Sequence, residues 1–520
     1  MSRTLPEYDI LVVGGTLYDG TLDPPYKCDM GIQGDQIIAL GDLGRSAKRI
    51  LDATGYIVTP GFIDCHNHTD VGWKMAEKAG LLNQPLADWK ENYNFTSQGV
   101  STIVTGNCGM GYTDVSAWFN AIKSVGGFGT NIYHLIPYEA MKLEVVGSDQ
   151  RPATAREIEL INKRVEEEMQ NGAAGFSTGL ELAPAVYDST DELVKVAKVV
   201  KKYNGIYATH LRSESGTRLN DGKIAVFEAI KEAIEIGRRS GIPVQISHLK
   251  INLVPADPRE IIELVEAARK EGIDVTADQY PYDSGMQRIV VRLDTKFRTG
   301  ELVRDEFKST QGREELKKGV ESALAITGPG SIEIVSCDAN KDYEGRNLEQ
   351  IARAEGRSAA DVFTELSCLE RPPFCIFFTQ NMDVVRRLMT QEWVFTSSDA
   401  SMLPQSMVHI LGKFHPRFYG NFPRKIRQFA LDEHLIDLQF AVRSMTSLPA
   451  KKFGLINRGR IAVNHFADIA IIDIAKFTDK ATYENPAQYS DGLVGLIVNG
   501  IVEIQKGTMT GDIGGRPCSK

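Results

Sequence analysis

The chain of 520 residues lacks any apolar run approaching the roughly 18 residues that a membrane-spanning helix needs. Residues 1–9 also lack the apolar core of a signal peptide. Positive charge is in deficit, because 59 Lys and Arg face 68 Asp and Glu, which gives a net charge of −9 without any basic cluster. These absences argue against a membrane protein and against non-specific binding to nucleic acid or anionic lipid.

Cysteine is scarce and badly placed for disulfides, since the seven residues form an odd set without close spacing. In a long chain this usage is typical of free thiols in a reducing compartment, so we predict a cytoplasmic protein. The hydrophobic share of 42% and the charged share of 24% are those of an ordinary globular protein, and they are compatible with a homo-oligomer.

Both ends of the chain read as short strands separated by turns. At the N-terminal end these include residues 9–13 and 29–33, with a Gly14-Gly15 turn between them, and at the C-terminal end residues 468–474 and 495–498. We predict that residues 1–60 and 450–520 pair into one small β-sandwich domain.

The middle of the chain alternates strands with helices. Strands are expected at residues 56–64, 101–105, 131–136, 174–177, 206–209, 243–247, 274–278 and 393–397. Helical periodicity marks residues 155–170, 191–202, 223–239 and 259–271. Eight strands are the number that a closed (β/α)8 TIM barrel requires, so we predict such a barrel over residues 61–449. The rhythm breaks at 287–332, where we expect an inserted lid or subdomain.

Residues of the types that commonly bind metals follow five of these predicted strands. They are His66 and His68 after the first, Cys108 after the second, His210 after the fifth, His248 after the sixth and Asp399 after the eighth. Active sites of such barrels lie at the carboxyl ends of the strands. Imidazole, thiolate and carboxylate suit zinc, and six ligands exceed the four of one tetrahedral ion. We therefore predict zinc, as one or two ions.

Each of these residues has a plainer interpretation by itself. A single histidine at a strand end is more often packed in a core, Cys108 alone would be a small buried apolar residue, and Asp399 alone would cap the next segment. Unrelated core residues have no reason to gather on one face of a barrel, which favours the metal site. We expect the other histidines at 134, 409, 434 and 465 to lie outside it.

Several motifs carry a resemblance to a known family. Residues 59–70 (TPGFIDCHNHTD) resemble the first-strand signature of the amidohydrolase superfamily. Residues 106–109 (GNCG), 175–181 (GFSTGLE), 208–214 (ATHLRSE) and 415–424 (HPRFYGNFPR) resemble the N-acyl-D-amino-acid deacylase (D-aminoacylase) family within it. The resemblance runs almost end to end.

This resemblance implies roles for the candidate residues. Cys108, His210 and His248 would hold the tighter zinc, and His66, His68 and Asp399 would face a weaker position that shares the Cys108 sulfur. Asp399 would be the general base and acid, acting on a metal-activated water.

The resemblance also implies that Lys250, Tyr282 and Arg417 bind the substrate carboxylate. Arg417 offers a planar fork that matches a carboxylate, and Lys250 lies two residues beyond His248, on the same face of a strand. Arg212 stands two residues beyond His210 in the same way, and we expect it to support the site by anchoring Glu214 or Asp399.

The leading hypothesis is zinc-dependent hydrolysis of N-acyl-D-amino acids to a carboxylate and a free D-amino acid. The sequence departs from the family at Leu182, where an aromatic residue is common, and at residues 285–287. Because these positions are expected to line the pocket, a second hypothesis is hydrolysis of another small-molecule amide, either cyclic, N-carbamoyl or xenobiotic. A third is a catalytically dead scaffold, which the presence of all six metal-binding residues disfavours.

Overall fold

Eight parallel strands form the central sheet of the computed structural model, which describes residues 8–44, 46–83, 89–147, 149–299, 302–408 and 412–520. In chain order the strands are β8 (Phe62–Asp64), β9 (Val100–Thr105), β10 (Asn131–Pro137), β11 (Gly175–Gly179), β12 (Ile206–His210), β13 (Val244–Ile246), β14 (Val275–Gln279) and β21 (Val394–Thr396). Each pairs in parallel with the next. The first and last strands meet just beyond their ends, where the Asp399 amide donates to the His66 carbonyl and the His68 amide to the Ala400 carbonyl. This contact closes the predicted barrel.

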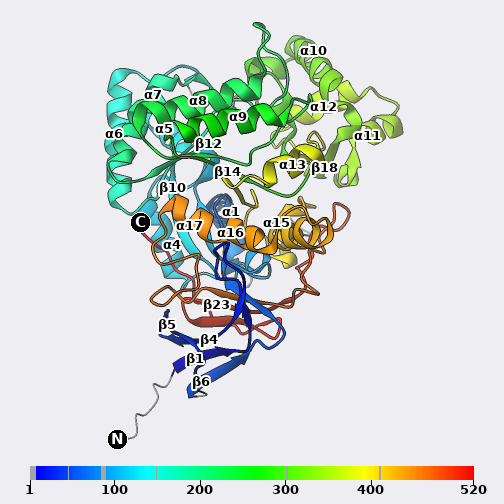
Figure 1. Ribbon diagram of the computed structural model, residues 1–520. Coiled ribbons are helices and arrows are strands. Elements are labelled where there is room, and N and C mark those ends of the chain that lie inside the picture. Colours follow the sequence, from blue (N-terminus) through cyan, green and yellow to red (C-terminus); the bar gives the residue numbers. More distant parts are fainter. Residues whose placement is uncertain (1–7, 45, 84–88, 148, 300–301, 409–411) are drawn as a thin grey trace, which may run out of the picture.

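Helices surround the barrel, as Figure 1 shows. Among them are α1 (Thr69–Lys78), α4 (Val115–Ser124), α5 (Tyr138–Val146), α6 (Ala155–Gln170), α7 (Thr190–Lys201), α8 (Ala225–Ser240), α9 (Pro258–Lys270) and α13 (Met382–Met389). The four helices predicted from periodicity are α6 to α9, displaced by at most two residues at either end. Thr154 and Glu157 form a capping box at the start of α6, and Asp257 caps α9 ahead of Pro258, so local side chains fix where these helices begin.

The predicted first strand, residues 56–64, is two strands in the structure. Residues Ile57–Pro60 form β7, which belongs to another sheet, and β8 begins at Phe62. Gly61 lies between them, and a side chain there would meet the Ser101 hydroxyl at 2.3 Å. The chain therefore passes from one sheet to the next at a position where a larger residue would clash.

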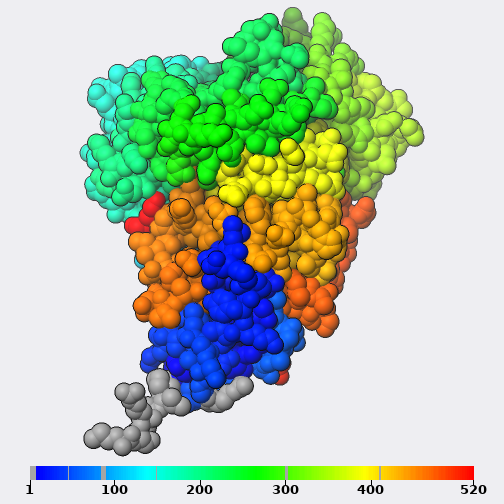
Figure 2. All heavy atoms as spheres, in the orientation of Figure 1, coloured from blue at the N-terminus to red at the C-terminus, as the bar shows by residue number. Residues whose placement is uncertain are grey.

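The two ends of the chain share one small β domain. A seven-stranded sheet joins β2 (Thr16–Leu17), β3 (Tyr26–Lys27) and β7 to β22 (Ile469–Ile472), β23 (Leu493–Val498), β24 (Ile501–Gln505) and β25 (Thr508–Met509). A four-stranded sheet adds β1 (Tyr8–Val13), β4 (Asp29–Gln33), β5 (Gln36–Gly41) and β6 (Ala47–Asp52). Apolar residues from both ends, such as Ile32 and Ile497, share one core. Figure 2 shows the N-terminal segment beside orange C-terminal segments in the lower part of the molecule.

A further sheet is inserted between β14 and β21. It contains β15 (Gly285–Arg288), β18 (Ile332–Ser336), β19 (Arg346–Asn347) and β20 (Phe374–Phe377) and packs with α10 (Thr310–Thr327), α11 (Leu348–Glu355) and α12 (Ala359–Ser367) around a separate apolar core. The insertion is therefore longer than the predicted segment 287–332. The prediction was too short because the later strands and helices of the insertion alternate in sequence as those of the barrel do. Its helices form a lobe at the upper right of Figure 1. Of the helices described, none has both the length and the apolar character to cross a membrane.

Candidate metal centre and carboxylate-binding residues

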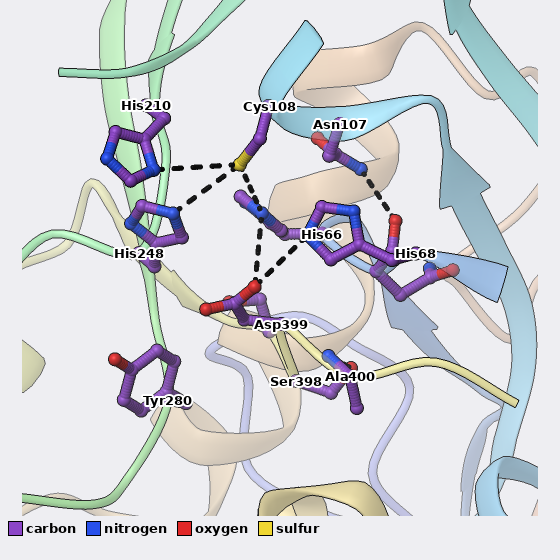
Figure 3. A network of polar contacts seen from close by, with 12 residues as sticks. His66, His68, Asn107, Cys108, His210, His248, Tyr280, Ser398, Asp399 and Ala400 are labelled. Carbon is purple, nitrogen blue, oxygen red and sulfur yellow. Dashed lines mark hydrogen bonds and ion pairs between the residues drawn. The ribbon is translucent and has the colours of Figure 1, made fainter. Parts of the chain in front are cut away.

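The six predicted metal-binding residues lie together at the carboxyl ends of the barrel strands (Figure 3). His66 and His68 follow β8, and Cys108 lies in η2 (Asn107–Gly109), a single turn after β9. His210 ends β12, while His248 and Asp399 follow β13 and β21 by a few residues. His66, Cys108, His210 and His248 are buried, so water competes little for their ligand atoms.

The Cys108 sulfur is at the centre of the cluster. It lies 3.3 Å from His66 Nε2, 3.5 Å from His248 Nε2 and 3.9 Å from His210 Nδ1. A tetrahedral zinc with sulfur and nitrogen ligands separates such atoms by about 3.5 Å. The cysteine and its neighbouring imidazoles therefore fit one zinc ion without rearrangement.

A second group of ligand atoms adjoins the first. Asp399 Oδ1 lies 3.2 Å from His68 Nε2 and 3.7 Å from His66 Nε2. Three ligand sets, each within 4.8 Å, overlap here: His66 with His68 and Cys108; Cys108 with His210 and His248; and His66 with His248 and Asp399. Because Cys108 belongs to two of them, the arrangement suits two adjacent cation positions that share the sulfur.

Each histidine next to the cysteine has a carboxylate on its outer nitrogen. Glu181 Oε2 lies 3.0 Å from His210 Nε2, Glu214 Oε1 lies 2.8 Å from His248 Nδ1, and Asp278 Oδ1 lies 3.4 Å from His66 Nδ1. Such carboxylates fix the ring orientation and raise the basicity of metal-binding imidazoles. None of these three roles was predicted from the sequence, although all three acids stand just after a strand or near its end.

The charges of the cluster stabilise one another. Burial disfavours the Cys108 thiolate, but His66 and His248 more than offset this and hold the pKa of the thiol well below its usual range. Burial likewise opposes a charged His66, yet Cys108 and Asp278 raise its pKa well above the usual value. In Asp399 the effect of burial is outweighed by Arg417 and His248, and the pKa of the carboxyl lies well below its usual range. The side chains thus present a thiolate and a carboxylate, which are the forms that bind cations.

Three of the six residues have left-handed backbone. The φ angles are 51° at Cys108, 33° at His248 and 50° at Asp399. This conformation is unfavourable for residues other than glycine, and it occurs mainly at functional positions where neighbouring contacts hold it. The His248 amide donates to Asp278 and the Asp399 amide to the His66 carbonyl, so each turn is fixed by another strand end.

Two cationic side chains border the cluster, and both were predicted to bind a substrate carboxylate. Lys250 Nζ lies 2.7 Å from Glu214 Oε1, and Arg417 Nη1 lies 2.8 Å from Asp399 Oδ2. The ring of Tyr280 lies against both, 5.6 Å from Lys250 Nζ and 4.9 Å from the Arg417 guanidinium carbon. Tyr280 was not singled out from the sequence.

Two other predicted residues have different surroundings. The ring of Tyr282 lies against Arg424, at 4.7 Å, and near His415 and Tyr483. Tyr280 thus contacts Lys250 and Arg417, while the hydroxyl of Tyr282, which was predicted to bind the substrate carboxylate, is buried with no hydrogen-bond partner among the described residues. Arg212 pairs with Glu232 at 2.8 Å and donates to the carbonyls of Val186 and Asp188, not to Glu214 or Asp399 as predicted.

The remaining histidines for which no metal role was expected are accounted for as follows. His134 is buried and contacts the Thr105 hydroxyl and the Tyr112 carbonyl, both at 2.8 Å. His434 follows the helical segment η10 (Lys425–Asp432), and His465 precedes β22 in the small β domain. His409 lies outside the described residues.

Comparison with known proteins gives matches over the whole chain. Two models described as the amidohydrolase family match residues 57–323 and 382–502. The D-aminoacylase of Alcaligenes xylosoxydans xylosoxydans is 30% identical over 99% of this chain and 98% of its own length. The N-acyl-D-glutamate deacylase of the same organism is 29% identical over 95% and 93%.

A solved structure extends the comparison. The N-acyl-D-glutamate deacylase of Bordetella bronchiseptica, complexed with zinc and a phosphonate that mimics the tetrahedral intermediate, has a TM-score of 0.81 and 26% identity. The match covers 99% of this chain and all of that one.

Proposed function

Because this chain belongs to the amidohydrolase family, we propose that it is a zinc-dependent enzyme that hydrolyses N-acyl-D-amino acids to a carboxylate and a free D-amino acid. The observation that supports this substrate class most directly is the position of Lys250 and Arg417 beside the Cys108 cluster. A cluster that suits zinc is typical of many amide hydrolases, but two buried cations next to it suit a substrate with a free carboxylate. The D configuration rests on the relatives, whose names specify D-aminoacyl substrates.

In this proposal Cys108, His210 and His248 would hold the tighter zinc ion. His66, His68 and Asp399 face a second position, and Cys108 is common to both. When bound, zinc supplies a Lewis acid that polarises the amide carbonyl and makes water more acidic. Glu181 and Glu214 keep the rings of His210 and His248 in the orientation that the ion requires.

Asp399 is the group that moves protons. Its carboxyl is ionised at neutral pH because neighbouring cations lower its pKa, and Oδ1 lies on the side of the metal-binding histidines. It takes the proton from the attacking water and passes it to the nitrogen of the leaving amino acid, which would otherwise be a poor leaving group. Arg417, 2.8 Å from Oδ2, fixes the carboxylate plane for both transfers.

The amino-acid carboxylate binds to Lys250, Arg417 and the buried hydroxyl of Tyr282, which has no other partner among the described residues. The two cations neutralise the carboxylate, and the ring of Tyr280 holds their side chains in place. Neither Lys250 nor Arg417 is exposed, so a carboxylate that reaches them leaves water and forms strong charge-assisted hydrogen bonds.

The direct test combines elemental analysis with an amine-release assay on matched N-acetyl-D- and N-acetyl-L-amino acids. We expect one to two equivalents of zinc and release from the D members only. Zinc with no release from any pair would contradict the substrate class while leaving the metal site in place. Protein purified without chelator that retains no metal would contradict the enzyme proposal as a whole.

We also propose a cytoplasmic location, which the free state of all seven cysteines supports.

A further inference from the structure

A cavity of about 470 Å³ opens beside Cys108, between the barrel and the inserted lobe. Its barrel side is formed by Cys108, by Ala140 and Leu143 of α5, and by Leu182 and Ala183 after β11. The lobe supplies Leu302 together with the charged residues Arg288, Glu370 and Arg371. A volume of this size belongs to the range of about 300–1,000 Å³ that binds drug-sized ligands, far more than an acetyl group of two carbons needs.

The surface of this cavity is mainly apolar. Leu143 and Leu302, which both border the cavity, are 46% and 45% exposed. Glu139 is the one acid on the barrel side of the cavity. Its Oε1 accepts a hydrogen bond from the Gly179 amide, and its Oε2 occupies the position that a Cβ atom on residue 109 would take. Because that carboxyl group turns to the backbone, it leaves the apolar surface available to an apolar ligand.

The cavity and the carboxylate-binding residues lie on opposite sides of the barrel mouth. The cavity is bordered by the loops after β9, β10 and β11, whereas Lys250, Tyr280 and Arg417 come from the segments after β13, β14 and β21. In the closed barrel these two sets of strands face each other. The metal cluster lies between them, with Cys108 forming one wall of the cavity.

An N-acyl amino acid is divided in a matching way, with a charged part on one side of its scissile amide bond and an apolar acyl chain on the other. The carboxylate and the side chain both belong to the amino acid, on the nitrogen side, and the acyl chain extends from the carbonyl carbon in the other direction. With the carboxylate at Lys250 and the carbonyl at the metal cluster, the group that reaches the cavity is the acyl chain.

We propose that this cavity binds the acyl group and that the preferred substrates are N-acyl-D-amino acids with an apolar linear acyl chain longer than acetyl, of medium length. This inference rests on the function proposed above. The lobe takes part in specificity, since Leu302 covers the outer end of the chain.

The first experiment is a series of substrates with one D-amino acid and acyl chains of two to twelve carbons. Each buried methylene is expected to raise kcat/KM about fourfold until the cavity is full. The hexanoyl substrate, with four added methylenes, would then exceed the acetyl one by up to roughly two-hundredfold. A kcat/KM that is highest for acetyl and falls with chain length would overturn the inference, although the proposed function would stand. No release with any acyl chain would overturn both.

A variant locates the chain. Ala140→Phe places a ring in the cavity, and we expect it to reduce the hexanoyl-to-acetyl ratio of kcat/KM by tenfold or more. The matched control is Ala325→Phe, on an exposed part of α10 that does not line the cavity, and it should keep the wild-type ratio. If Ala140→Phe instead alters the preference among D-amino-acid side chains at constant acetyl and leaves the acyl series unchanged, the cavity binds the side chain and the assignment to the acyl chain is wrong.

Discussion

Glu214 connects the metal centre to the carboxylate-binding residues, and its removal should affect both. Its Oε1 lies 2.8 Å from His248 Nδ1 and 2.7 Å from Lys250 Nζ, and both Glu214 and Lys250 are buried. Glu214→Gln keeps the shape and removes the charge. Loss of a carboxylate behind a metal-binding histidine lowers metal affinity by about 10- to 100-fold. Leaving a buried cation without its partner destabilises a protein by about 3–5 kcal/mol.

The same variant should change how substrate binding depends on pH. Burial lowers the pKa of Lys250, but Glu214, followed by Tyr280 and Asp399, more than offsets it, so the pKa of the ammonium lies above its usual value. Without Glu214 the largest of the raising effects is lost, so the pKa of Lys250 falls and the ammonium loses its proton at a lower pH. KM for an N-acyl-D-amino acid should therefore begin to rise at a lower pH in Glu214→Gln than in the wild type.

Three measurements test this reasoning: zinc affinity by chelator competition, the free energy of unfolding of the zinc-free protein, and KM between pH 6 and 10. Glu232→Gln is the control, because Glu232 forms a comparable pair with Arg212 outside the cluster. The control should keep wild-type zinc affinity. Zinc affinity within twofold of wild type in Glu214→Gln, together with an unchanged KM profile, would refute the assigned role of Glu214.

Three further predictions concern the same centre. Asp399→Asn should lower kcat by about 10²- to 10⁴-fold while zinc remains at Cys108, and a loss below tenfold would exclude Asp399 as the group that moves protons. Arg417→Met should raise KM for N-acyl-D-amino acids and leave the zinc content close to that of the wild type; a change in KM that is equal for substrates with and without a carboxylate would argue against carboxylate binding. Zinc affinity should rise with pH between 6 and 8, about tenfold per pH unit for each proton released. The reason is that the pKa of His66 is well above its usual value and that of His68 is raised to about 9, so both carry protons that an ion must displace; affinity independent of pH in an isothermal titration would contradict this.

Much of the architecture could be predicted from the sequence, because barrel strands and helices differ in their periodicity. The eight strands, the four helices and the pairing of the two chain ends are local patterns or follow from them. The border between β7 and β8 was not predicted, although Pro60 and Gly61 interrupt the apolar residues of the segment 56–64, and only the approach of Ser101 shows why the chain changes sheet at Gly61. Apolar runs identify strands without saying to which sheet they belong.

The metal-binding residues could be predicted because they follow strands, and the carboxylates behind them could not. Asp278 contacts His66 although more than two hundred residues separate them in the chain. Such contacts depend on barrel closure, which brings distant strand ends side by side. The acids Glu181 and Glu214 did stand in the motifs that carry the family resemblance, so a search for one carboxylate per predicted histidine would have found them.

Tyr280 and Tyr282 show where strand alternation stops predicting the direction of side chains. In a strand, residues two apart share a face, so the two tyrosines would be equivalent if β14 continued through them. The strand ends at Gln279, and Pro281 follows Tyr280. Beyond a strand end the direction of each side chain is set by local turns, and here these turn Tyr280 to Lys250 and Tyr282 to Arg424.

The same loss of regularity explains how the strand ends form a site. At Cys108, His248 and Asp399 the left-handed backbone turns the chain directly after a strand, and each such residue destabilises the fold by about 1–3 kcal/mol. A residue that continued the strand would point either into the barrel interior or outward to the surrounding helices. The turned residues instead bring a sulfur, an imidazole and a carboxylate to one point. Contacts from neighbouring strand ends, such as Asp278 with the His248 amide, hold these turns. The folded barrel therefore brings together ligand atoms that lie far apart in the unfolded chain, so that binding of a metal ion favours the folded state.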